Sequence, residues 1–306
     1  MTADLDPRDL AAEETSQRAI DAEREEPAGV CLGLFDGIPD AEYRAAQGLS
    51  ASEAKVLLGK RPPAPSPALA LGTMFHTVTL EPHLADQYQP ADAEKIGVKS
   101  DGTPAQNPTM TTAWKRFVAE AEQDGKTVVA QADWDMVSRM RDAVYAHKTA
   151  ASILEMCARR EVSGWARHET GVLVKGRIDA LGNGIVADLK STKDAGPDRF
   201  GRTCSDFYYH VSMANYADIA IAAGERVETL VFINAEKEPP YRVSVVELAP
   251  RAVDLGREQM AEACRRWLAL GRVELPSYGD GATTIDLPPW AYRGGYGDYF
   301  EIGEAS

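Results

Sequence analysis

The stretch GRIDALGNGIVADLKST, residues 176–192, decides the fold because it predicts a β-hairpin that carries charged side chains. Apolar and β-branched residues lie on both sides of an Asn-Gly dipeptide, which is typical of a tight hairpin turn. Side chains alternate between the two faces of a strand, so Asp188 and Lys190 share one face. Asp179 then lies roughly opposite Ala187 or Asp188. The hairpin can therefore bring two carboxylates and an ammonium group close together.

Two carboxylates at such a distance repel each other unless one takes up a proton or a cation lies between them. Magnesium favours one or two carboxylates together with water and phosphate oxygens. A lysine beside that ion can orient a water molecule or offset the charge of a phosphate. The alternative is a surface strand in which Asp188 only forms a salt bridge with a lysine. Asp188 stands within the apolar run IVADL, however, where a charged residue is rarely buried without a partner. The pattern favours metal-assisted phosphodiester hydrolysis.

The rest of the chain predicts a helical N-terminal half that leads into a mixed α/β core. Segment 1–40 is acidic and expected to be disordered, and residues 41–306 are expected to form a single domain. Helices are predicted at 50–59, 69–81, 111–125, 132–156, 207–224 and 251–271, with an exposed loop at 90–110. Three antiparallel strands are predicted within 161–192, and two further strands at 228–237 and 241–250.

Composition limits the class of protein. Of the 306 residues, 44% are hydrophobic, which suffices for one large domain. The sequence contains no run of about 18 apolar residues and no signal peptide. Its four cysteines form no CxxC pair. We therefore expect a cytoplasmic protein that does not bind a membrane. The net charge of −14 argues against loose, charge-driven binding of nucleic acid. Metal ions or a local basic groove can nevertheless coexist with an acidic exterior.

The segments GRIDA and ADLKST resemble the core motif of the PD-(D/E)XK nuclease superfamily, with an aspartate in the D/E position. The order of LSASEAKVLL, LALGTMFHTVTLEP, ETGVLVKGRIDAL, ADLKSTKDA and YYHVSMANYAD resembles the RecE-type exonuclease domain (exodeoxyribonuclease VIII) of phage and prophage recombination. This resemblance covers roughly residues 43–290. It implies an α/β (α+β) fold with a restriction-endonuclease-like core, in which helices flank a mixed sheet.

The resemblance also implies roles for individual residues. His76, in a GxxxH pattern, Asp179, Asp188 and the carbonyl of Leu189 would hold the metal, which is Mg²⁺ with Mn²⁺ as a substitute. Lys190 would be the catalytic lysine, acting together with the two aspartates. The alternative for His76 is an ordinary buried side chain on an apolar helix.

Three further residues are accessory candidates. Glu161 opens the first strand and is either an extra acid near the site or a solvated strand end. Tyr216 would be the tyrosine of the family's QxxxY motif, or a core residue. Ser212 stands where that motif has glutamine, which puts substrate handling more in doubt than metal binding.

Basic and aromatic residues around the hairpin are candidates for contact with nucleic acid. Arg177 faces either phosphate or a carboxylate such as Asp179, and the Tyr-Tyr-His run is either a helix start or a surface that faces DNA. The basic cluster after the hairpin is either a phosphate track or a solvated loop. The candidates are Arg177, Lys193, Arg199, Arg202, Tyr209 and His210.

The resemblance implies 5′→3′ degradation of linear duplex DNA, which leaves 3′ single strands for a RecT-like annealing protein. It also implies a ring-shaped homo-oligomer, such as a tetramer. The competing hypothesis is a non-catalytic module that keeps the nuclease fold and binds DNA ends or scaffolds a phage recombination complex. A helicase-fused or iron–sulfur nuclease is not expected, because the chain lacks both GxxxxGK[ST] and a suitable cysteine set.

Overall fold

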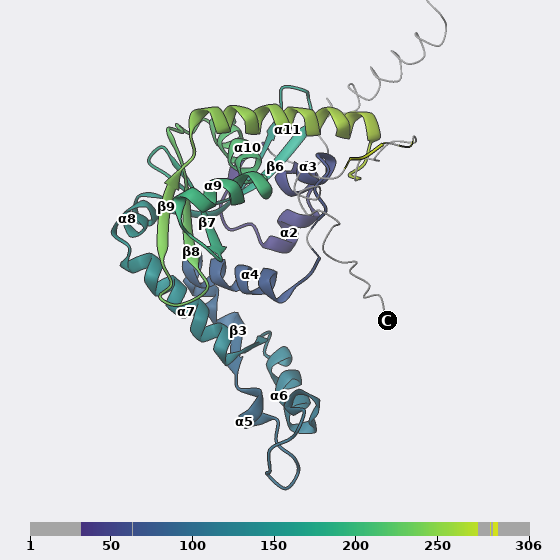
Figure 1. Ribbon diagram of the computed structural model, residues 1–306, viewed down its shortest axis with the longest axis vertical. Helices are drawn as coiled ribbons and strands as arrows, with labels where there is room; N and C mark the ends of the chain where they lie inside the picture. Colours follow the sequence, from purple (N-terminus) through teal and green to yellow (C-terminus); the bar gives the residue numbers. More distant parts are fainter. Residues whose placement is uncertain (1–31, 63, 275–281, 283, 287–306) are drawn as a thin grey trace, which may run out of the picture. The chain divides into compact units, whose positions relative to one another are not determined.

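A seven-stranded mixed β-sheet forms the centre of the computed structural model, which describes residues 32–62, 64–274, 282 and 284–286 (Figure 1). Its strands are β1 (Gly33–Phe35), β2 (Leu49–Ser50), β5 (Arg159–Arg167), β6 (Leu173–Gly182), β7 (Ile185–Thr192), β8 (Thr229–Glu236) and β9 (Val243–Glu247). Their order is β1-β5-β6-β7-β8-β9, with β2 beside β6. The three predicted strands β5, β6 and β7 are antiparallel, whereas β7 and β8 are parallel.

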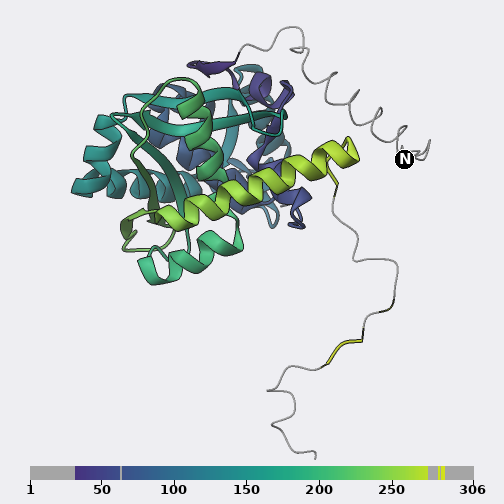
Figure 2. The same ribbon diagram turned by 90° about the horizontal axis from the view of Figure 1, so that it is seen from above.

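Helices cover both faces of this sheet, which confirms the predicted fold class (Figures 1 and 2). One face is covered by α4 (Pro67–Leu80), α7 (Gln131–Ala146) and α8 (Lys148–Met156). The other is covered by α9 (Pro197–Asp206), α10 (Tyr209–Ala222) and α11 (Pro250–Leu270). The long helix α11 crosses over α10 (Figure 1), and α10 is buried on nearly all sides because it lies between α11 and the sheet. The short helices α2 (Asp40–Ala45) and α3 (Ala51–Leu57) precede α4.

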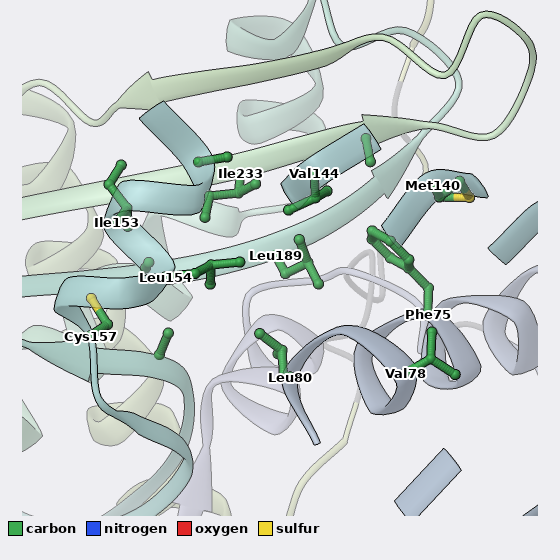
Figure 3. Packing of buried hydrophobic residues seen from close by; sticks show 14 of the residues in the cluster. Phe75, Val78, Leu80, Met140, Val144, Ile153, Leu154, Cys157, Leu189 and Ile233 are labelled. Atoms are coloured by element: carbon green, nitrogen blue, oxygen red, sulfur yellow. The ribbon is translucent and has the colours of Figure 1, made fainter. Parts of the chain in front are cut away.

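The core beneath α4 fixes this helix against strand β7 (Figure 3). Phe75 and Val78 are one turn apart on α4 and belong to the same buried cluster as Leu189 of β7 and Met140 of α7. Full burial of side chains of this size contributes about 1.5–3 kcal/mol each. The packing therefore sets the position of the residue that follows Phe75, which is His76.

The hairpin between β6 and β7 turns where the sequence predicts. Asn183 has φ 48° and Gly184 has φ 78°, and two consecutive positive φ angles are the mark of a type I′ turn. The side chain of Asn183 also donates to the carbonyl of Met156 at 2.7 Å. This hydrogen bond ties the turn to the end of α8.

Some local elements differ from the sequence-based expectation. The predicted helix 132–156 is two helices, because the chain turns at His147, whose Nδ1 accepts the N–H of Ala150 at 3.2 Å and caps α8. Helix α9 was not predicted. The predicted loop 90–110 overlaps three short elements. The elements of that region are β3 (Tyr88–Ala91), α5 (Ala93–Ile96), the 3₁₀ turn Pro108–Met110, α6 (Thr112–Gln123) and β4 (Thr127–Ala130), which pairs in parallel with β3.

The predicted domain boundaries remain predictions. Residues 1–31 of the predicted disordered segment lie outside the described residues, while Gly33–Phe35 at its end pair with β5. The chain divides into two units, Met1–Leu275 and Pro276–Ser306. The aromatic-rich tail 287–300 also lies outside the described part. No helix among the described residues is long and apolar enough to cross a membrane.

Candidate active site

The candidate site lies where strands β6 and β7 separate. Their ladder ends at the pair Ala180–Ala187, so continuation of the same register sets Asp179 opposite Asp188. In place of the next ladder bond, Oδ2 of Asp179 accepts the N–H of Leu189 at 2.7 Å. Asp179 is 7% and Asp188 2% exposed, so two carboxylates are buried side by side. Such burial is costly unless a proton, a cationic side chain or a metal ion offsets the charge.

His76 reaches this gap from helix α4. Its Nε2 donates to the carbonyl of Leu189 at 2.7 Å, and its Nδ1 lies 3.5 Å from Oδ2 of Asp179. Helix α4 packs on β7, where Gly72 lies near the hydroxyl of Ser191, and this packing brings His76 to the gap. The sequence-predicted trio of His76, Asp179 and the Leu189 carbonyl is therefore brought together.

Glu161 joins the same cluster from strand β5. Its Oε1 lies 3.7 Å from Nδ1 of His76, and its Oε2 accepts Nε of Arg177 at 2.9 Å. Glu161 has φ 47°, a left-handed conformation that is rare for a non-glycine residue within a strand. Strain of this kind concentrates at functional sites. Of the two sequence alternatives, Glu161 is thus an acid at the site, and the partner of Arg177 is Glu161 rather than Asp179.

The donor set of this cluster fits a divalent cation. Ligand atoms of His76, Glu161 and Asp179 all lie within 4.8 Å of one another. One imidazole nitrogen with carboxylate oxygens and a neighbouring backbone carbonyl is a set that Mg²⁺ and Mn²⁺ accept. Asp188 is not among these three residues, and its Oδ2 contacts Nζ of Lys190. Its role as a metal ligand stays a prediction.

Charge and burial oppose each other at the cluster. Burial raises the pKa of Asp179 to about 7, although His76 counteracts it. For His76, burial disfavours the charged form, but the carboxylates of Asp179 and Glu161 outweigh burial and raise the pKa to about 9. Without a cation, a protonated His76 therefore neutralises the neighbouring acids near neutral pH.

Because a histidine must be neutral to bind a metal, binding of Mn²⁺ is expected to strengthen with pH. Between about pH 7 and about pH 8.5, above the pKa of Asp179 and below that of His76, the apparent affinity should rise by up to about tenfold per pH unit, since each bound ion displaces about one proton. Titration calorimetry in two buffers of different ionisation enthalpy measures both the affinity and the released protons.

The matched control for this titration is His83→Ala, which removes an exposed histidine outside the cluster and should keep the full dependence on pH. His76→Ala should bind more weakly and show a smaller dependence, because it loses the group that releases the proton. An affinity of the wild type that is constant with pH contradicts the assignment of His76 as a ligand.

Lys190 is the cation nearest to Asp188. Its Nζ contacts Oδ2 of Asp188 and lies 5.1 Å from the ring centre of Tyr209. Burial disfavours its charge, but Asp188 and Asp179 outweigh burial and raise its pKa. Lys190 is therefore a fixed positive charge at neutral pH and not a proton acceptor.

A second lysine at the site was missed from the sequence. Nζ of Lys55, on α3, lies 5.4 Å from the ring centre of the same Tyr209. Burial and then Lys190 lower the pKa of Lys55 to about 8. The only signal in the sequence was a lysine placed within the apolar run EAKVLL of a predicted helix.

Tyr216 packs in the core beside the site, and its role as the tyrosine of the QxxxY motif stays a prediction. A β-carbon on Gly176 would lie only 2.9 Å from Cδ1 of Tyr216, so the ring packs directly on the backbone of β6. Burial, followed by the charges of Asp188 and Asp179, raises the pKa of Tyr216. Ser212 lies one turn earlier on α10.

The close contact between Gly176 and Tyr216 predicts that Gly176→Ala and Gly201→Ala change the stability of the fold in opposite directions. Gly176→Ala should lower the free energy of unfolding by about 1–3 kcal/mol, because the added methyl group forces the ring of Tyr216 to move. Gly201→Ala in α9 meets no atom within 4 Å and should stabilise the helix by about 0.5–1 kcal/mol. Urea denaturation of both variants measures the difference, and equal stabilities contradict the packing described.

The predicted contacts with nucleic acid divide into two groups. His210 is 6% exposed, and its Nε2 pairs with Oε1 of Gln259 on α11 at 2.7 Å. Its assignment as a surface contact is therefore wrong, because tertiary packing buries the side chain. The other candidates keep this role as a prediction: Lys193, Arg199 and Arg202 are exposed, whereas Arg177 and Tyr209 are partly buried.

Comparisons with known proteins support the fold that carries this site. A family model described as "PDDEXK-like domain of unknown function (DUF3799)" matches residues 42–286. A crystal structure from Eubacterium rectale described as "Putative exonuclease" is 12% identical with a TM-score of 0.50, covering 85% of this chain and 100% of that one. A second structure, of the protein SSO0001, is 14% identical with a TM-score of 0.24, covering 67% and 97%. No curated protein sequence matches the chain. The family match and the first structure show the fold.

Proposed function

The chain belongs to the DUF3799 family of PDDEXK-like domains, and from this membership we propose that it is a metal-dependent nuclease that hydrolyses DNA. One observation carries the proposal. His76, Asp179 and Glu161 converge in the gap between β6 and β7, while Lys190 pairs with Asp188 beside it. A structural salt bridge accounts for Asp188 and Lys190 but leaves unexplained why a histidine and two further acids are gathered there.

Each residue has a chemical task in this proposal. His76, Asp179 and Glu161, with the Leu189 carbonyl, would hold the cation, and Asp188 would complete the acidic set. A divalent cation bound there supplies a Lewis acid for the phosphodiester and lowers the pKa of water. Lys190 keeps its proton and stabilises the negative charge that develops on the phosphate. Arg177 orients Glu161 through the hydrogen bond between Nε and Oε2.

The form of the DNA substrate and the direction of its degradation are also proposals. We propose an exonuclease that acts on linear duplex DNA in the 5′→3′ direction with Mg²⁺, and that supplies 3′ single strands to a RecT-like annealing protein. The resemblance of the ordered motifs to RecE-type domains supports this direction. A ring-shaped homo-oligomer would agree with the net charge of −14, because only the lining of its channel must be positive.

A comparison of DNA forms tests the exonuclease assignment. Incubation with Mg²⁺ should release mononucleotides from linear duplex DNA and leave a covalently closed circle of the same sequence intact. Label at the 5′ ends should be released before internal label. Equal cleavage of the circle would make the protein an endonuclease.

Absence of cleavage would lead to a different conclusion. If neither DNA form is cut with Mg²⁺ or Mn²⁺, the non-catalytic alternative is supported in place of the enzyme. That alternative draws on Ser212, which stands where related domains have glutamine, and on the acidic composition.

A further inference from the structure

An exposed aromatic ring stands on a column of rings next to the candidate active site. Phe207 is 59% exposed, and its ring stacks on that of Tyr209 with centroids 5.6 Å apart and planes 18° from parallel. Tyr209 in turn stacks on Phe200 at 6.2 Å, and Phe200 is buried in the core. A solvent-exposed phenylalanine is thus held by a fixed support instead of moving freely.

The backbone holds this ring at a corner of the fold. Phe207 and Tyr208 are the two residues between α9 and α10, and Tyr208 has φ 53°. A left-handed conformation at a residue with a side chain costs about 1–2 kcal/mol. The backbone of this turn is therefore unfavourable in itself, and packing of the surrounding side chains must stabilise it. The turn leaves the side chain of Phe207 exposed to solvent.

Lysine side chains surround the same corner. Nζ of Lys60 lies 4.7 Å from the ring centre of Tyr208, and Nζ of Lys55 lies 5.4 Å from that of Tyr209. Among the residues that the structure describes, neither lysine forms a salt bridge with a carboxylate. In a chain with a net charge of −14, two such ammonium groups beside the two tyrosines that follow Phe207 form a local site for an anion. The exposed acidic residue nearest to Phe207 in the sequence is its neighbour Asp206.

The corner also adjoins the proposed catalytic lysine. Nζ of Lys190 lies 5.1 Å from the centre of the Tyr209 ring, the ring on which Phe207 stacks. Helix α3, which carries Lys55, packs against α10. A ligand that lies on Phe207 and reaches Lys55 would therefore pass beside the gap between β6 and β7.

We propose that Phe207, Lys55 and Lys60 form a binding surface for a single strand of nucleic acid, in which Phe207 stacks on a nucleobase and the two lysines neutralise the adjoining phosphates. Aromatic rings interleaved with cations are the means by which proteins bind single strands without reading their sequence. The inference deepens the proposed nuclease function and rests on it for the identity of the ligand.

Binding is measured with the full chain by fluorescence anisotropy of a labelled oligothymidylate in EDTA, so that no hydrolysis is needed. Phe207→Ala should weaken binding about 5- to 150-fold, the range for loss of one base–aromatic stack. Phe207→Trp should bind at least as well as wild type, because it retains a flat ring. Ile221→Ala, which shortens a side chain that is 48% exposed near the other end of α10, should bind as wild type.

Salt dependence separates the role of the lysines from that of the ring. Lys55→Gln and Lys60→Gln should each lower the slope of log affinity against log salt by about 0.7, since one phosphate contact is lost. Phe207→Ala should leave that slope unchanged. Thermal melting should show the wild-type transition for Phe207→Ala, because the ring that is removed lies at the surface.

Three results would overturn the inference: no binding of the oligonucleotide by wild type, equal affinities of Phe207→Ala and Ile221→Ala, or unchanged salt slopes in both lysine variants. The result of the binding experiment is independent of the nuclease assay. Binding that depends on Phe207 without any cleavage of DNA refutes the enzyme and keeps the surface. Cleavage by wild type with a neutral effect of Phe207→Ala on binding refutes the surface and keeps the enzyme.

Discussion

Replacement of Lys190 by alanine is expected to lower the rate of phosphodiester hydrolysis by about 10²–10³-fold, the usual effect of removing one group that stabilises charge in a transition state. The reason is the fixed positive charge of Lys190, whose pKa is raised by Asp188 and Asp179 against the effect of burial. A protonated lysine cannot accept a proton from water, so its contribution to hydrolysis must be electrostatic. The rate at saturating DNA measures this effect.

The alanine variant also leaves Asp188 buried without its cation, which can cost about 3–5 kcal/mol of stability. Lys190→Arg serves as the second variant, because it keeps the charge and the ion pair with Asp188. Its fold should be retained, and its activity should lie between those of wild type and alanine, since the planar guanidinium differs in shape from an ammonium. Lys148→Ala, at an exposed lysine on α8, should hydrolyse as wild type. Wild-type activity in both Lys190 variants contradicts the assigned role.

Asp179→Asn is expected to abolish the stabilisation that a divalent cation gives to the folded protein. A ligand present at a hundredfold excess over its Kd stabilises the fold by about 2.7 kcal/mol. For a domain of this size that corresponds to a rise in Tm of roughly 5–10 °C. Asparagine keeps the shape of the side chain and can still accept the N–H of Leu189, but it removes one of the two carboxylates from the cluster. The variant should therefore fold, fail to respond to Mn²⁺ and lose hydrolysis.

Thermal melts with and without Mn²⁺ measure this response. Asp142→Asn is the matched control, because it removes an exposed carboxylate on α7, and its Tm should rise with Mn²⁺ as that of wild type does. The melts should be recorded above about pH 7, where the pKa of about 7 for Asp179 leaves its charged form populated. A full Mn²⁺-induced rise in the Asp179→Asn variant contradicts the location of the metal.

The sequence predicted those features that depend on local pattern. The Asn-Gly turn, the alternation along 161–192 and the apolar periodicity of α4 are short-range signals, and the strands and helix follow them. His76 and Asp179 lie about a hundred residues apart, and no periodicity relates them. They could be joined only through the ordered motifs of a resembling family, and the structure then brings them within 3.5 Å.

Other features depend on tertiary packing that the sequence does not encode locally. The parallel pairing of β3 with β4 links segments separated by helix α6, so neither strand carries a hairpin signal. His210 reads as a polar residue at a helix start, but α11 covers it and Gln259 binds it. Lys55 was not predicted as a site residue. The periodicity of α3 predicts a helix but does not indicate that Tyr209 and Lys190 lie beside Lys55.

The release of nucleotides from end-labelled linear duplex DNA tests the central claim most directly. With Mg²⁺, wild type is predicted to release labelled nucleotides, EDTA to stop the release, and Asp179→Asn to release none while it keeps the wild-type fold. Continued release by Asp179→Asn, or release that EDTA does not stop, would contradict a metal-dependent centre formed by His76, Glu161 and Asp179.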